Sequence, residues 1–194
     1  MDTSLLKSRW IARCSGIPAL GLEVLHVVQR SLGPDPGKVL VNELGLWALR
    51  FLLLCLAMTP LRLITGQTFW TTWRRAIGLW AFFWATLHLI AYAVLLLGLD
   101  LSRIGREIVH RPYLVLGALT WCLLLPLAVT STRAWQKRLK QGWLKLHRLI
   151  YPAALLAVVH GSWVQKLSFA GFWPYMLATV ILAAVRIVNQ MQKK

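Results

Sequence analysis

Cysteines are scarce in this chain of 194 residues, and those present do not form a metal-binding pattern. Cys14, Cys55 and Cys122 stand alone in three separate apolar runs, and no CxxC pair occurs. An iron–sulfur cluster or a structural zinc site is therefore not expected.

Acidic residues are equally few, with 6 Asp and Glu against 22 Lys and Arg, for a net charge of +16. Such a charge can indicate nucleic-acid binding, but the basic residues lie mostly in short links between apolar runs. This distribution is the positive-inside pattern of membrane proteins, so nucleic acid is not an expected partner. Long alternation with a period of two is also lacking, which argues against a membrane β-barrel.

The chain is instead rich in long apolar runs, and 58% of its residues are hydrophobic. Soluble domains average about 45–50% apolar residues. The runs predict an all-α integral membrane protein, a six-helix transmembrane bundle forming a single domain over residues 1–194. The expected spans are approximately 10–28, 41–60, 77–99, 113–130, 147–165 and 172–188.

The basic residues also predict the orientation of the bundle. The leader, the links 61–76 and 131–145 and the tail together carry roughly twice as many Lys and Arg as the opposite side. Both termini are therefore expected to be cytoplasmic. The first run partly resembles a signal peptide, but Glu23 interrupts it and no small-residue cleavage site is convincing, so we expect a retained span.

Three histidines fall within or beside the expected spans. His147 and His160 bound an apolar run in the fifth span, and His88 lies in the middle of the third. Histidine within a membrane segment is costly without a partner, and imidazole is a common axial ligand of haem iron. The alternative is that these histidines make polar helix contacts or lie near the interface.

The expected topology allows their depths to be compared. Measured from the cytoplasmic side, the depths of His88 and His160 differ by only roughly 3 Å, at a rise of about 1.5 Å per residue. Such a pair suits a bis-imidazole haem clamp between the third and fifth spans. His147 remains at the cytoplasmic edge as a second or alternative ligand. On an ideal helix it would point about 140° away from His160, unless a kink at Pro152 realigns them or they face different cofactors.

Three arginines are candidates for binding anionic groups. Arg74 and Arg75 occupy the level on the third span that faces His147, where they could bind a phosphate or a carboxylate. Arg50 lies within the second span, about 13 Å along the helix from Val41. We expect it to face the bundle and neutralise a haem propionate; the alternative is that it snorkels to the outer surface.

Sequence blocks spread over most of the chain resemble a known family, the MsrQ (YedZ) haem-binding membrane subunits of periplasmic protein-methionine-sulfoxide reductase systems. This family belongs with the ferric-reductase-like transmembrane domains. The blocks are TP at 59–60, RRAIGLWAFFWATLHLIAY at 74–92, RPYLVLGALTW at 111–121, AVTSTRAWQKRL at 128–139 and LHRLIYPAALLAVVH at 146–160.

The resemblance implies an inner-membrane protein that binds b-type haem and FMN and passes electrons to a periplasmic molybdopterin partner, MsrP. Its three histidines would match His88, His147 and His160. From their position facing His147, we expect Arg74 and Arg75 to bind the FMN phosphate or a haem propionate. The related NADPH oxidases carry a second histidine on the third span, which is absent here. No G-x-G-x-x-G occurs, so electrons would come from the quinone pool or a cytosolic flavin reductase.

Two other functions stay open at this point. A stand-alone ferric or quinone reductase would use the same haem without a periplasmic partner. A small transporter would use the histidines as a proton relay. An electron-transfer subunit needs no catalytic residue of its own, because reduction of methionine sulfoxide would take place on the partner.

Overall fold

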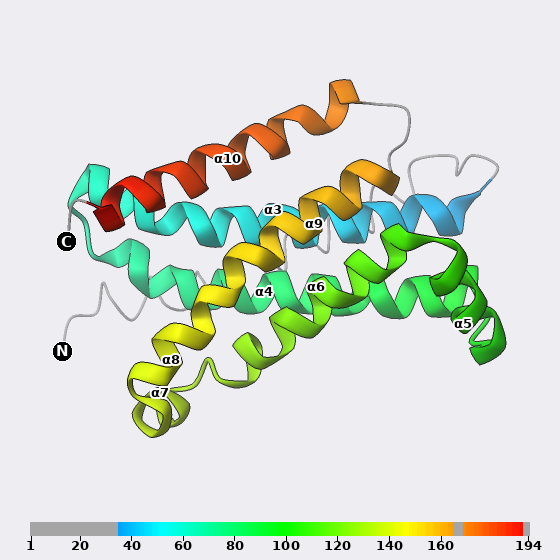
Figure 1. The fold of residues 1–194 in the computed structure, drawn as a ribbon, viewed down its shortest axis with the longest axis horizontal. Helices are drawn as coiled ribbons and strands as arrows, with labels where there is room; N and C mark the ends of the chain where they lie inside the picture. Colours follow the sequence, from blue (N-terminus) through cyan, green and yellow to red (C-terminus); the bar gives the residue numbers. More distant parts are fainter. Residues whose placement is uncertain (1–34, 165–168, 192–194) are drawn as a thin grey trace. The chain divides into compact units, whose positions relative to one another are not determined.

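The computed structural model describes residues 35–164 and 169–191, and these ranges contain helices and no strand. Contacts divide the chain into two compact units, Met1–Arg106 and Glu107–Lys194, and each unit is described by itself. The first predicted span, residues 10–28, lies outside the described residues. Figure 1 shows the helices of both units.

The first unit is built on a long helix, α3 (Pro36–Thr65). Asp35 caps its start by accepting a hydrogen bond from the backbone N–H of Lys38 at 3.1 Å. Pro36 stands at the first helical position, where a missing N–H costs nothing. The helix ends at Gly66, whose φ of 68° is left-handed and whose N–H donates to the carbonyl of Arg62 at 3.0 Å.

The chain then returns along α3 as α4 (Phe69–Ala91), which continues into a π-helical turn, η1 (Tyr92–Leu96). Ala81 and Trp84 of α4 are fully or almost fully buried, and Trp84 stacks on Trp47 of α3 with ring centroids 6.0 Å apart. Small and aromatic residues thus bring the two helices together, as expected where lipid provides no hydrophobic drive.

Both helices extend beyond the expected spans. α3 begins before and ends after residues 41–60, because it passes through Pro60 and stops only at the glycine cap. α4 begins at Phe69 rather than at 77, so the expected link 61–76 shrinks to residues 66–68 between the two helices.

The segment between the expected spans 77–99 and 113–130 is also helical. It forms α5 (Leu101–His110), which crosses the boundary between the two units. Its start is capped by Asp100, whose carboxylate accepts hydrogen bonds from the backbone N–H groups of Ser102 at 2.9 Å and Arg103 at 3.2 Å.

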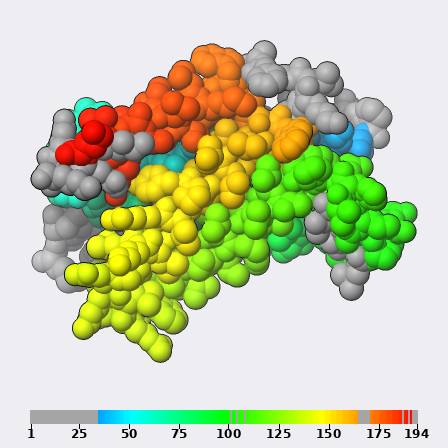
Figure 2. Space-filling view, in the orientation of Figure 1, coloured from blue at the N-terminus to red at the C-terminus, as the bar shows by residue number. Residues whose placement is uncertain are grey.

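The second unit is organised around α9 (Ile150–Val164), which packs against α6 and α10. On the face shown in Figure 2, α9 lies between these two helices. Ala153 and Ala154, at its N-terminal end, are almost fully buried. The other elements of the unit are α6 (Pro112–Val129), α7 (Arg133–Leu139), α8 (Gln141–Leu146), the 3-10 turn η2 (His147–Leu149) and α10 (Phe169–Met191).

Three helical segments of the described residues are long and apolar enough to cross a membrane. They are Pro36–Thr65, Phe69–Leu96 and Pro112–Val129. The expected fifth span, 147–165, begins with the 3-10 turn, and its regular helix α9 has 15 residues. A shorter apolar segment, Gly171–Arg186, lies within α10. Residues 35–164 and 169–191 thus provide three candidate spans, and the expected total of six stays a prediction.

Candidate functional site

His88, in the last turn of α4, is tied to the facing helix of its unit. Its Nδ1 lies 2.8 Å from the backbone carbonyl oxygen of Val41 on α3. A carbonyl oxygen only accepts, so Nδ1 must carry the proton and donate. In the neutral ring the lone pair then lies on Nε2, the atom that can ligate a metal.

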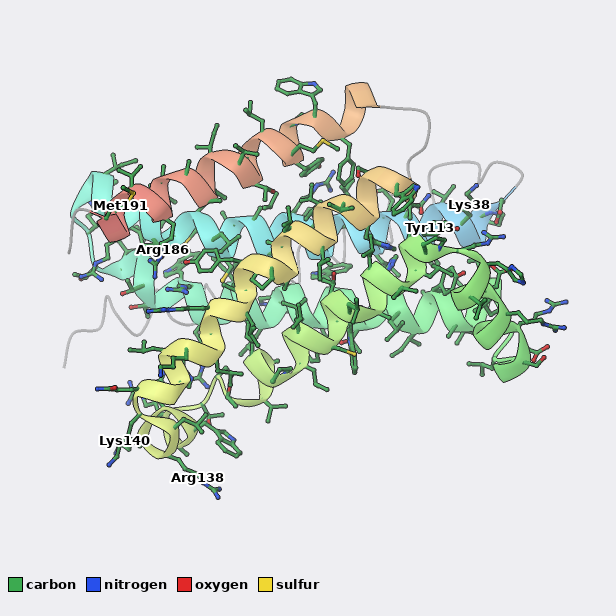
Figure 3. The ribbon with its side chains drawn as sticks, in the orientation of Figure 1. Lys38, Tyr113, Arg138, Lys140, Arg186 and Met191 are labelled. Carbon is green, nitrogen blue, oxygen red and sulfur yellow. The ribbon has the colours of Figure 1, made fainter. Side chains whose placement is uncertain are left out.

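His160, on α9, repeats this arrangement in the second unit. Its Nδ1 donates to the backbone carbonyl oxygen of Tyr113 at the start of α6, at 2.7 Å. Figure 3 labels Tyr113 at this position. In both units the carbonyl precedes its histidine by 47 residues. The same tautomer is therefore fixed twice, by a backbone partner of the kind that orients metal-ligating histidines.

Both histidines lie level with the first turns of the helix they contact. His88 was expected eleven residues into a span beginning at 77, but α4 begins at Phe69 and His88 lies in its last turn. Arg74 and Arg75 thus lie inside this helix rather than before it, and the equal depth of His88 and His160 stays a prediction. The pairing of His88 with His160 stays a prediction, since the two residues belong to different units.

His147 is held in another way. Its Nδ1 donates to the carbonyl of Trp143, 3.2 Å away in the preceding α8, and its ring stacks on the Trp143 indole. Trp143 in turn donates from Nε1 to the carbonyl oxygen of Thr130 at 2.9 Å, which connects α8 to the end of α6. These contacts hold the His147 imidazole against its own segment.

The expected helical geometry between His147 and His160 does not apply. His147 begins the 3-10 turn η2, and α9 starts only at Ile150. Pro152 lies in the first turn of α9, and the departure from a regular α-helix at residues 147–149 lies in the turn before it. A proline disturbs the turn that precedes it, because its ring meets the carbonyl of the residue four positions earlier. The realignment of the two histidines by a kink at Pro152 therefore stays a prediction.

Arg50 is half-buried on α3, with its guanidinium carbon 4.8 Å from the ring centroid of Trp47. Because Trp47 stacks on the buried Trp84, this cation lies on the aromatic cluster of the first unit. It is also about 13 Å along α3 from Val41, where His88 is anchored. An arginine side chain and a propionate would together have to span that separation.

Arg74 and Arg75 lie in the second turn of α4, the first half-buried and the second exposed. The carbonyl of Arg74 accepts a hydrogen bond from the Cys55 thiol, with Sγ 3.4 Å away. Next to them, Nε1 of Trp73 is buried and has no hydrogen-bond partner among the described residues. A guanidinium group suits an anionic partner such as a phosphate, and Arg74 and Arg75 point about 100° apart around α4.

Comparisons with known proteins show the family of the chain. A family model described as "Ferric reductase like transmembrane component" matches residues 44–158, more than half of the chain. Two relatives, from Xanthomonas oryzae pv. oryzae and Xanthomonas euvesicatoria pv. vesicatoria, are 48% and 52% identical over 171 residues, covering 85% of this chain and 78% of each relative. Each is named "Protein-methionine-sulfoxide reductase heme-binding subunit MsrQ".

The chain belongs to the MsrQ family. A third MsrQ relative, from Xanthomonas campestris pv. campestris, is 52% identical over 136 residues, 70% of this chain and 62% of its own length. With its apolar helices and its ferric-reductase-like component, this MsrQ-family chain is a membrane protein.

One residue of this MsrQ-family chain was missed in the sequence. Arg186 of α10 has a buried Nε without a hydrogen-bond partner among the described residues, and its guanidinium carbon is 5.8 Å from the ring centroid of Tyr151 on α9. Arg186 is labelled in Figure 3. The sequence signal that could have identified Arg186 is that a cation lies inside the expected span 172–188. The carbonyls of Val41 and Tyr113 gave no signal, because every residue has one.

Proposed function

We propose that this chain is a membrane electron-transfer subunit that binds b-type haem through His88 and His160. The observation that carries the proposal is that Nδ1 of both imidazoles donates to a backbone carbonyl of the adjacent helix. The relatives' printed name, a heme-binding subunit, supports the same conclusion. Bound haem supplies a one-electron carrier whose potential depends on its ligands and its burial.

The residues fit this cofactor chemically. A neutral imidazole with its proton on Nδ1 presents Nε2 as a ligand, and the hydrogen bond to the carbonyl raises the basicity of that ligand. His147 is a second or alternative ligand, because its Nδ1 is also hydrogen-bonded to a carbonyl. Arg50, which lies on the aromatic cluster of α3, would neutralise a haem propionate.

The fit extends to FMN at the start of α4. Arg74 and Arg75 would hold its phosphate or a haem propionate through their guanidinium groups. The donor of electrons would be the quinone pool or a cytosolic flavin reductase. The acceptor would be a periplasmic molybdopterin methionine-sulfoxide reductase, MsrP, which repairs oxidised envelope proteins. The chain would form a six-helix bundle in the bacterial inner membrane, with both termini cytoplasmic.

Reconstitution tests this function directly. The purified chain is placed in liposomes and reduced, and methionine sulfoxide is added with or without the periplasmic reductase. We expect rapid reoxidation of the haem absorption bands only when the reductase and its substrate are both present. Equal reoxidation without the reductase would indicate a stand-alone ferric or quinone reductase, and a purified chain without a Soret band would exclude electron transfer by haem.

A further inference from the structure

Two glycines lie directly against the imidazole rings. A Cβ atom at Gly45 of α3 would lie 2.9 Å from Nδ1 and 3.0 Å from Cε1 of His88. A Cβ at Gly117 of α6 would lie 2.9 Å from Cε1, 3.1 Å from Nδ1 and 3.2 Å from Nε2 of His160. Favourable contacts between carbon atoms lie at about 3.5–4.0 Å, so neither position has room for a methyl group while the ring stays in place.

The three nearly equal distances at Gly117 show which side of the His160 ring faces this glycine. An atom beyond the edge of a ring would be clearly closer to one ring atom than to the next two. The Cβ position is instead at similar distances from Cε1, Nδ1 and Nε2, so the face of the His160 ring lies against the helix at Gly117. An alanine there would displace the ring plane itself.

Backbone conformation does not explain these glycines. Positive φ among the described glycines occurs at Gly66 and Gly98, whereas Gly45 and Gly117 lie inside α3 and α6. Glycine is less favourable than alanine within a helix. The helices thus accept this cost at two positions where the missing side chain makes room for an imidazole.

The arrangement is the same in both units. The carbonyl of Val41 or Tyr113 accepts from Nδ1, and one helical turn later a glycine contacts the same ring. The repeated combination fixes the ring by one atom and by its face, which determines the direction of Nε2 and the plane of the imidazole.

We propose that Gly45 and Gly117 are positioning residues that set the orientation of the His88 and His160 imidazoles as haem ligands. This inference rests on the proposed function, because it assigns the orientation of its ligands. Each glycine and the carbonyl one turn before it form an imidazole seat, the seat of His88 on α3 and the seat of His160 on α6.

The test compares Gly45→Ala and Gly117→Ala with two control variants. Gly78→Ala adds a methyl group inside the same helix pair, 3.3 Å from Cys55 Sγ and away from any histidine, and Gly142→Ala adds one in open space. Electron paramagnetic resonance of the ferric proteins measures ligand orientation, and titration with haemin measures affinity. We expect both seat variants to shift or lose the wild-type low-spin signal and to bind haem roughly 10–100-fold more weakly, while both controls match the wild type.

Unchanged signals and affinity in both seat variants would overturn the seats while leaving haem binding intact. A wild-type protein without haem would instead overturn the proposed function. If an alanine variant does not accumulate in the membrane, imidazole is added to His88→Gly, which keeps Gly45 and Val41. Restoration of the low-spin spectrum is expected, and failure to restore it would contradict the seat.

Discussion

His147 stacks on Trp143 with ring centroids 3.9 Å apart and an angle of 27° between the ring planes. The stack is local, because both residues lie in consecutive short elements, α8 and η2. His88 and His160 instead donate to a carbonyl on a neighbouring long helix. His88 and His160 are thus anchored between helices, and the Trp143 contacts of His147 lie within one segment.

The first prediction follows from that difference. His147→Ala should retain the low-spin haem that we assign to His88 and His160, because it removes neither of those two ligands. The absorption and paramagnetic resonance spectra of the purified variant provide the measurement. Complete loss of low-spin haem in His147→Ala would make this histidine a primary ligand and contradict the assignment.

The second prediction concerns flavin. Arg74→Gln combined with Arg75→Gln should lower FMN content several-fold, because charge-assisted contacts to phosphate are roughly twice as strong as neutral ones. Flavin fluorescence after denaturation gives the content per chain. Arg62→Gln, which removes an exposed arginine from the last turn of α3, is the matched control. FMN occupancy that stays constant in the double variant would count against an anion site there.

The third prediction concerns Arg50. If its guanidinium neutralises a propionate, Arg50→Met should lower the haem midpoint potential, because loss of a cation disfavours the electron-rich ferrous state. A tenfold change in the equilibrium corresponds to about 59 mV for one electron, so we expect a shift on the order of tens of millivolts. Redox titration with Arg62→Met as control measures it. An unshifted potential at full haem loading would show that Arg50 only packs on Trp47.

The fourth prediction is a pH effect at the start of α5. The hydroxyl of Ser102, 2.7 Å from the Asp100 carboxylate, and the N–H of Arg103 lower the pKa of Asp100 below its usual 3.8. A lowered pKa means that the charged cap stabilises the folded form above pH 3.8, and that this contribution is lost as the pH falls through the lowered value.

Nuclear magnetic resonance of the detergent-solubilised protein can follow the titration of that carboxyl group. Ser102→Ala should raise the pKa of Asp100 toward 3.8, since it removes the hydrogen bond that lowers it most. An identical titration in wild type and variant would show that the hydroxyl does not act on the charge.

The helices were predictable where apolar runs are long, but their ends were not. Pro60 suggested an end to the second span, yet α3 continues to Gly66, because packing against α4 supports the helix through the proline. Asp100 and Ser102 begin α5 with a cap that was overlooked in favour of a charged loop. The proline and the capping residues were thus visible in the sequence. Whether each one ends or begins a helix depended on tertiary contacts that the sequence does not show.

Only the side chains of the candidate site were predictable from the sequence, and their backbone partners and the neighbouring glycines were not. His88, His147 and His160 stand out as histidines in or beside apolar runs. Their carbonyl partners do not, because a backbone oxygen has no residue signature. Gly45 and Gly117 resemble ordinary small residues of a membrane helix until the ring atoms beside them are seen.

The central claim is that His88 and His160 ligate haem, and removal of each imidazole tests it most directly. Haem content and the ferric low-spin signal are measured in wild type, His88→Ala, His160→Ala and the control His110→Ala, whose side chain is exposed on α5. We predict a Soret band and a low-spin signal in wild type and control, and loss of that signal in both other variants. Full haem content with an unchanged low-spin signal in His88→Ala and His160→Ala would contradict the account.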